Sequence, residues 1–301
     1  MSNTLSPSTV KPDDFAAYWQ QTLTELAALP IAAEEEVIPL RSTEYNTTYA
    51  VRYTGLGSYR LFAYLSIPQG EGPFPTIVNL PRYGSVLEPV RQGDAVEKRS
   101  RYVMFSPAGR GQRNAERPYE AGFPGIFLDG IDDPQSYIFR GFVADQFRAI
   151  DYLLTRPEVD RSRIMAAAGS DLPILTAAFR PEITHLVTDP AFFYAALDRA
   201  ALTSGYPLEE INDYLRLYPD RQAQVARTLA YFDPLFFAPQ VQATTLLWGQ
   251  PEVVDPLAEA LAGPVEIRPS EHSSYKDGLY QENWTATQFG YEAAILPAHW
   301  Q

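Results

Sequence analysis

The hydrophobic positions of this 301-residue chain recur with a helical period in two long segments. Between residues 12 and 29, aromatic and leucine side chains return every three or four positions, and Pro30 ends the run. The same spacing returns over 137–155, where phenylalanine and aliphatic residues share one face. Both segments predict amphipathic helices. Shorter helices are expected at 173–179, within 191–230 and at 256–262.

Short apolar runs between turn residues predict the strands of a sheet. An antiparallel pair is expected at 49–54 and 59–67, because the turn signal GLGS separates the two runs. The runs at 76–80 and 102–106 are apolar and flanked by proline, which is typical of buried parallel strands. The remaining strands alternate with helices and are predicted at 163–168, 184–188, 244–248 and 264–268. This alternation predicts an α/β fold, in which a doubly wound, mainly parallel sheet carries helices on both faces.

The order of these elements favours a single domain over residues 1–301, since neither an internal repeat nor a low-complexity linker divides the chain. In this interpretation residues 1–35 are an N-terminal helical extension, and 191–230 are a helical insertion over the carboxyl edge of the sheet. The stretch 110–136 is rich in Gly, Pro and Asp and predicts a long loop. Loops of this length in compact domains are either functional or disordered.

The composition narrows the possible partners. A formal charge of −13 opposes binding to nucleic acid or to an anionic membrane, because both attract basic surfaces. The chain has no cysteine and three histidines, which argues against disulfides, thiolate chemistry and a histidine-rich metal site. The N-terminus lacks a signal-peptide profile and no apolar run approaches the length of a membrane span, so we expect a soluble cytoplasmic protein.

The nine residues AAAGSDLPI, at 166–174, predict a buried strand, a sharp turn and the start of a helix. Ser170 stands where an α/β-hydrolase carries its nucleophile, in the pattern G-x-S-x-G. Ala168 and Leu172 replace the two glycines of that pattern, so the alternative is that Ser170 is only a turn residue. A nucleophile in this strained turn should have a positive φ, and its hydroxyl should face the catalytic histidine.

Serine acyl transfer also needs a general base and an acid that orients the imidazole. In α/β-hydrolases these two residues follow the serine along the chain, each after a strand. His272 follows the predicted strand at 264–268, and Glu252 and Asp255 both follow the strand at 244–248. Three residues therefore stand in the right order for a triad, with either acid available.

Four stretches of the chain also look familiar. They are KPDDFAAYWQQTLTEL near the N-terminus, GRGQ at 109–112, YIFRGFVADQFRAIDYLLTRPEVDRSRI at 137–164, and TLAYFDPLFFAP at 228–239. Over most of its length the chain resembles the acetyl xylan esterase and cephalosporin C deacetylase family of carbohydrate esterases. The resemblance implies an α/β-hydrolase fold and deacetylation of small esters or acetylated sugars without a cofactor. It also implies a homo-oligomer, in the form of a ring-shaped hexamer.

Carried over position by position, the resemblance implies a role for each residue of the site. It gives Ser170 as nucleophile, His272 as general base and Glu252 as the acid, with a hydrogen bond expected between Glu252 and His272. The oxyanion would be held by the backbone N–H groups of Tyr83 and Asp171. The residues that would brace the site are Arg110 and Gln112 of the RGQ motif.

The departures from the family pattern lie at the same site. The family has G-x-S-Q-G where this chain has AGSDL, and its glutamate after the histidine is here Ser273. The charge of Asp171 beside the oxyanion and the bulk of Leu172 in the turn are both expected to slow the reaction. The sequence therefore predicts a serine ester hydrolase with weakened activity. The alternative is a non-catalytic homologue that serves binding or assembly.

Overall fold

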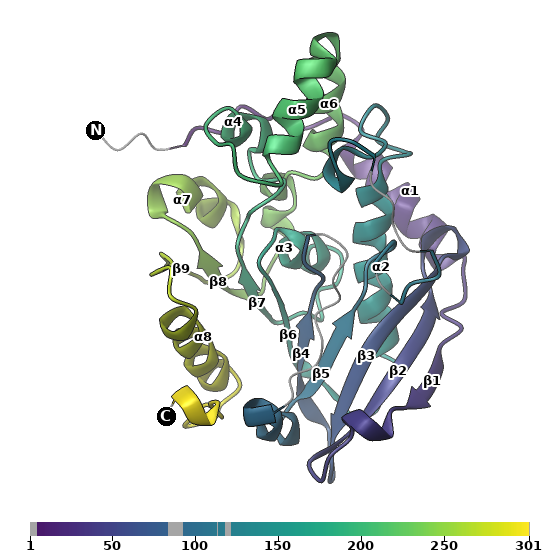
Figure 1. Cartoon of the computed structure of the whole chain (residues 1–301), viewed down its shortest axis with the longest axis vertical. Coiled ribbons are helices and arrows are strands. Elements are labelled where there is room, and N and C mark those ends of the chain that lie inside the picture. The colour runs from purple at the N-terminus through teal and green to yellow at the C-terminus, as the bar shows by residue number, and fades with distance from the viewer. Residues whose placement is uncertain (1–4, 84–92, 113, 118–121, 301) are drawn as a thin grey trace.

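The computed structural model describes residues 5–83, 93–112, 114–117 and 122–300, and Figure 1 shows their arrangement. The strands described form a single sheet in the order β1-β2-β3-β5-β4-β6-β7-β8-β9. They are β1 (Glu34–Val37), β2 (Asn46–Thr54), β3 (Arg60–Pro68), β4 (Phe74–Asn79), β5 (Val103–Pro107), β6 (Val159–Ala168), β7 (His185–Thr188), β8 (Thr244–Trp248) and β9 (Val265–Arg268). The predicted strands are confirmed. The acidic edge strand β1 has no apolar alternation, and for that reason the sequence did not predict it.

The sheet is antiparallel at one end and parallel through the rest. β1, β2 and β3 pair antiparallel in sequence order, and β3 also pairs antiparallel with β5. From β5 through β4, β6, β7 and β8 to β9 every pairing is parallel. The mainly parallel sheet is therefore as predicted. Because β4 has β5 on one side and β6 on the other, the strand order reverses at β4. Open α/β sheets bind their ligands outside the carboxyl ends of the strands at such a point.

Helices cover both faces of this sheet. The longer ones are α1 (Phe15–Ala27), α2 (Ile138–Leu153), α5 (Glu209–Leu217), α6 (Gln222–Ala230), α7 (Pro251–Ala260) and α8 (Ser274–Gln288), and the short ones are α3 (Leu172–Ala177) and α4 (Ala196–Ala200). α7 begins five residues before its predicted start, because Pro251 occupies the first helical turn, where proline needs no hydrogen-bond donor. α8 was not predicted, and its hydrophobic residues do not form a regular stripe.

The core has a large cluster and a small one on opposite faces of the sheet, and a third, minor cluster of Ala50, Phe62 and Ala108. Alternate residues of one strand divide between the large and the small cluster: Val78 of β4 packs in the large cluster with α1, α2, α3 and α7, while Ile77 packs in the small one with Trp284 of α8. Trp19 of α1 is fully buried and donates its indole N–H to the Tyr231 carbonyl at 2.9 Å. The predicted N-terminal extension is therefore part of the main core.

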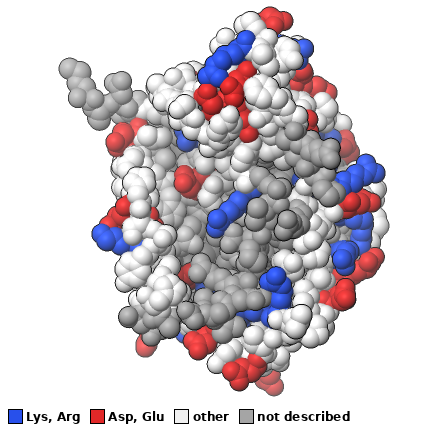
Figure 2. Space-filling view, in the orientation of Figure 1, with Lys and Arg blue, Asp and Glu red and all other residues white. Residues whose placement is uncertain are grey.

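The predicted helical insertion, 191–230, contains α4, α5 and α6, which stand together at the top of Figure 1, beyond one end of the sheet. Figure 2 shows acidic and basic side chains interspersed over this insertion and along the right-hand rim of the same face. Among the described residues, no helix is long and apolar enough to cross a membrane. That the chain forms one domain stays a prediction.

Candidate active site

Ser170 lies in the turn from β6 to α3, as the sequence predicts, but its conformation is not that of a nucleophile elbow. The side chain is fully buried, and its Oγ accepts a long hydrogen bond, 3.4 Å, from the Leu172 N–H. Ser170 is not among the described non-glycine residues with positive φ, which are Ala32, Ser58, Asn114, Ala195 and His272. The prediction of a positive φ at Ser170 is therefore wrong.

The Asp171 carboxylate explains how this turn is fixed. It is fully buried and accepts three consecutive backbone N–H groups, from Phe192 at 2.7 Å, Phe193 at 3.0 Å and Tyr194 at 3.1 Å. Burial raises the pKa of Asp171, although these N–H groups and Arg199 oppose the rise. Both carboxylate oxygens are bound to the 192–194 backbone, so the carboxylate fixes this turn, and the expected effect of its charge on an oxyanion stays a prediction.

Leu172 has a structural role of the same kind. It is fully buried within the large core cluster, at the first position of α3. An elbow glycine at this position would allow helix and strand to approach closely, whereas the leucine fills the space with apolar contacts. Asp171 and Leu172 together hold the turn in its closed form from two sides.

His272 lies in the loop between β9 and α8, where its side chain is exposed and its φ is 54°. Its backbone N–H donates to Ser270 Oγ at 3.0 Å. No hydrogen bond or ion pair joins the His272 ring to Ser170 or to either candidate acid, and all four residues lie in the described part of the chain. The predicted hydrogen bond between Glu252 and His272 is wrong, and Asp255 does not take its place.

The two candidate acids lie on α7, whereas His272 lies in the loop before α8. Glu252 is exposed in the first turn of α7 and Asp255 lies one turn further along that helix. The acid that supports the His272 loop is Asp277 of α8, which accepts Ser270 Oγ at 2.6 Å and the Glu271 N–H at 2.9 Å. Desolvation alone would raise the pKa of Asp277, but these hydrogen bonds and the nearby His272 lower it. Asp277 was not among the predicted residues, because the signal of an aspartate in a first helical turn depends on recognising the helix, and α8 was not predicted.

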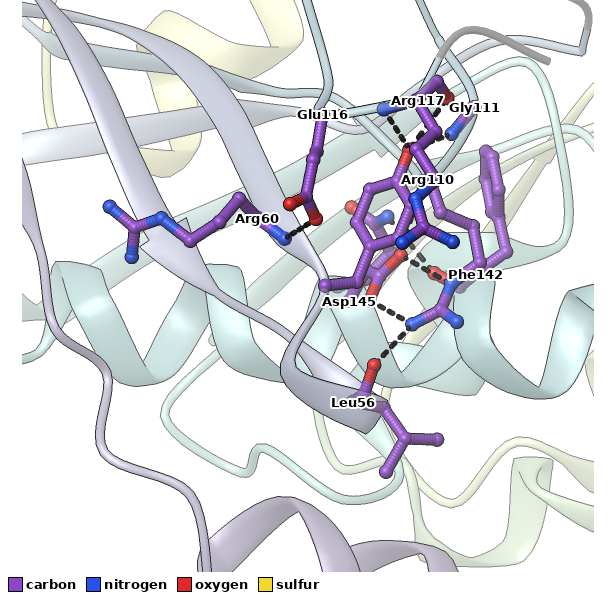
Figure 3. A network of polar contacts seen from close by, with 10 residues as sticks. Leu56, Arg60, Arg110, Gly111, Glu116, Arg117, Phe142 and Asp145 are labelled. Carbon is purple, nitrogen blue, oxygen red and sulfur yellow. Dashed lines mark hydrogen bonds and ion pairs between the residues drawn. The ribbon is translucent and has the colours of Figure 1, made fainter.

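Arg110 of the RGQ motif joins its loop to α2, while its predicted role of bracing a catalytic site stays a prediction. Arg110 donates to the buried carboxylate of Asp145 on α2 through its backbone N–H at 3.1 Å, Nε at 3.0 Å and NH2 at 2.8 Å, and NH2 also reaches the Leu56 carbonyl at 3.1 Å (Figure 3). Burial raises the pKa of Asp145 although Arg110 opposes the rise. The guanidinium also lies over Gly141 of α2, where an added Cβ would come within 2.1 Å of its central carbon. This ion pair fixes the loop to the core, and the Arg110 side chain is bound to Asp145.

Gln112 connects the same loop to the predicted oxyanion segment. Its Oε1 accepts the Gly109 N–H at 2.9 Å and its Nε2 donates to the Arg82 carbonyl at 3.2 Å. Tyr83 follows directly, half-buried, with its ring centroid 5.6 Å from that of Phe192. Residues 84–92, which continue this segment, lie outside the described residues.

A pocket of about 330 Å³ lies at the carboxyl ends of the central strands, where the strand order reverses. Its described lining comes from β4, β6, β7 and β8, from the segments that follow them and from α8, and consists of Asn79, Leu80, Arg82, Ala167, Ala168, Gly169, Val187, Asp189, Trp248, Ser270, Asp277, Gly278 and Gln281. Gly169, directly before Ser170, lines the pocket, whereas Ser170 and His272 are not part of this lining. In the described part of the chain, no group of three or more His, Asp or Glu side chains is placed to hold a metal ion.

A sequence model of the acetyl xylan esterase (AXE1) family matches residues 3–250. The chain belongs to this family. The acetyl esterase Axe7A of Xylanibacter ruminicola is 24% identical over 306 residues, covering 95% of this chain and 67% of that protein. Among solved structures, acetyl xylan esterase 1 from Thermoanaerobacterium sp. JW/SL YS485 has a TM-score of 0.81 at 20% identity and covers 93% of this chain and 96% of its own. The acetyl xylan esterase from Paenibacillus sp. R4 has a TM-score of 0.82 at 23% identity, with coverages of 95% and 98%.

These likenesses confirm the resemblance to the acetyl xylan esterases and the α/β-hydrolase fold. Membership in an esterase family supports carboxylic ester hydrolysis as the class of activity. Ser170 lies on the turn where the sequence predicts it, and no hydrogen bond or ion pair joins Glu252 to His272 in the described part of the chain; the catalytic roles of these residues stay predictions.

Proposed function

We propose that this protein is a carboxylic-ester hydrolase of the acetyl xylan esterase type whose activity is strongly weakened. Its substrates would be short acyl esters or acetylated sugars, with Ser170 as nucleophile and His272 as general base, and no cofactor would take part. The observation that carries the proposal is the position of Ser170, on the turn between β6 and α3, one residue from a pocket at the carboxyl edge of the sheet.

The closed turn supplies the physical reason for weak activity. To attack an ester, the Ser170 hydroxyl must leave its buried position, and its backbone must adopt the positive φ of an elbow. A non-glycine residue in such a conformation costs about 1–3 kcal/mol. This cost lowers the fraction of molecules with Ser170 in the reactive conformation by roughly fivefold to more than a hundredfold. The missing contact between His272 and an acid would lower the activity further. Glu252 or Asp255 would have to approach His272 in the same rearrangement.

One observation favours a second function, that of a non-catalytic binding protein. The pocket is lined by polar residues other than Ser170 and His272, so a ligand can occupy it without meeting either of them. In this alternative the scaffold and the pocket are kept while the reaction is lost.

Hydrolysis of p-nitrophenyl acetate by the purified full chain distinguishes the two functions. We expect a slow reaction that Ser170→Ala and His272→Ala each remove almost completely, while Ser204→Ala, an exposed serine in the helical insertion, has no effect. A fluorophosphonate probe should label the wild-type chain and leave Ser170→Ala unlabelled. Undiminished hydrolysis in Ser170→Ala would refute the assignment of the nucleophile, and an unlabelled wild type without hydrolysis would refute the esterase function in favour of the non-catalytic alternative.

A further inference from the structure

The pocket beside Gly169 holds polar groups that the fold itself does not use. The Asp189 carboxylate makes no hydrogen bond or ion pair within the described chain, and the same holds for the side-chain amides of Asn79 and Gln281. Trp248 is only 9% exposed and lines the same pocket, yet its indole N–H has no acceptor among the described residues. Asp189 is exposed, and Asn79 and Gln281 are half-buried, so these unpaired groups are open to a ligand that enters the pocket and supplies partners for them.

The chemistry of these groups defines the ligand. The described lining residues include two carboxylates, Asp189 and Asp277, and one guanidinium, that of Arg82, and this excess of negative charge favours a cation over an anion. Asp277 already accepts hydrogen bonds from Ser270 and Glu271, so Asp189 is the carboxylate that remains available. An ionised carboxylate only accepts hydrogen bonds, whereas an indole N–H only donates them. The ligand must therefore carry a charged donor together with acceptors.

The surroundings of Asp189 also favour a cation beside its carboxylate. Desolvation raises the pKa of Asp189 and the nearby Asp171 raises it further, while Arg199 opposes both. The Arg199 guanidinium donates to the carbonyls of Pro190 and Tyr194, and no hydrogen bond joins it to Asp189. An ammonium group placed against Asp189 would relieve the repulsion from Asp171 through a charge-assisted hydrogen bond.

We propose that this pocket binds a small polyhydroxylated amine, with the ammonium group at Asp189 and hydroxyl groups at Asn79, Gln281 and the Trp248 indole. The volume of about 330 Å³ lies at the lower end of ligand sites and suits a ligand of one sugar ring rather than a chain. The proposal does not depend on hydrolysis by Ser170, because neither Ser170 nor His272 is among the lining residues.

Three probes of one size and different charge test this proposal by isothermal titration calorimetry with the full chain. They are D-glucosamine, with its amine protonated, neutral D-glucose and anionic D-glucuronate. We expect D-glucosamine to bind at least tenfold more tightly than D-glucose, and D-glucuronate to bind more weakly than both. Asp189→Asn should lower the affinity for D-glucosamine roughly tenfold to a hundredfold, as expected for the loss of a hydrogen bond to a charged group, and should leave D-glucose nearly unchanged.

Asp220→Asn is the matched control, since it removes the same charge from an exposed site in the helical insertion and should leave all three affinities unchanged. The comparison of the three probes on the wild-type chain remains decisive if Asp189→Asn folds poorly. Equal affinity for D-glucosamine and D-glucose would overturn the ammonium assignment in favour of a neutral polyol. Preference for D-glucuronate, or binding of none of the three at millimolar concentration, would overturn the proposal itself.

Discussion

The buried carboxylate of Asp171 provides the sharpest test of how the turn at Ser170 is held. In the Asp171→Asn variant, one oxygen can still accept the N–H groups of Phe192 and Phe193, which share Oδ2 in the wild type. The new amide nitrogen replaces Oδ1, so the Tyr194 N–H would face a donor in place of its acceptor. Asp171→Ala removes all three acceptor contacts and also leaves a cavity.

The expected losses follow from these contacts. One buried donor left unpaired costs about 1–3 kcal/mol, so Asp171→Asn should lower the free energy of unfolding by that amount. Burial raises the pKa of Asp171, which means that the buried charge itself is unfavourable. A neutral asparagine avoids this cost, so we expect a loss in the lower half of the 1–3 kcal/mol range, about 1–2 kcal/mol. Asp171→Ala should lose about 3 kcal/mol or more. For a chain of this length the entropy of unfolding is about 0.6 kcal/mol/K, so the expected decreases in Tm are roughly 2–3 °C for Asn and at least about 5 °C for Ala.

Thermal unfolding followed by circular dichroism measures both variants, with Asp220→Asn as the control for the loss of an exposed carboxylate. Hydrolysis of p-nitrophenyl acetate is measured on the same samples. If Asp171→Asn unfolds at the wild-type temperature and hydrolyses the ester faster, the carboxylate acts on the reaction rather than on the fold, and our assignment is refuted. The same structure predicts that Asp171→Gln combined with Leu172→Gly, which would return two of the three departing positions to the family pattern, disrupts folding because both side chains are fully buried.

Two further predictions concern pH and assembly. Glu210 of α5 is 2% exposed and accepts the Phe127 N–H at 2.9 Å; burial raises its pKa to about 7, the N–H opposes the rise, and Asp213 adds to it. A folded-state pKa above the unfolded value gives stability that is complete below about pH 4.5 and is lost as the pH rises through 7. In the wild type, the free energy of unfolding measured in urea should therefore fall by an amount of order 3 kcal/mol between pH 5 and pH 8 because of Glu210. Glu210→Gln should remove this fall. An equally large fall in the free energy of unfolding of Glu210→Gln would contradict the role given to Glu210. A smaller fall should remain in the variant, because burial also raises the pKa of Asp233, to about 6. We also expect a homo-oligomer, on the resemblance alone, and a monomeric mass by light scattering at micromolar concentration would contradict it.

Local signals carried much of the fold prediction. The alternation of strands and helices gave the doubly wound sheet, and the apolar faces of α1 and α2 gave the two longest predicted helices, because burial imposes a regular period on residues close in sequence. Elements without that period, β1 and α8, were not predicted. The position of Ser170 after β6 was also predictable, since it depends on the ending of one strand and the start of one helix.

The sequence by itself determined the family, the order of the elements and the candidate residues, because each of these depends on patterns among residues that are close together in the chain. The tertiary structure decided what those residues do. Asp171 binds backbone groups more than twenty positions away, and Leu172 packs in a core to which the helices α1 to α7 and the sheet contribute, so their effect on Ser170 cannot be inferred from neighbouring residues. Whether Glu252 reaches His272, and whether Asp189 meets Trp248 in one pocket, depends on how separate elements are placed around the end of the sheet. Such contacts are fixed by packing between distant segments, to which the local sequence contributes only one side.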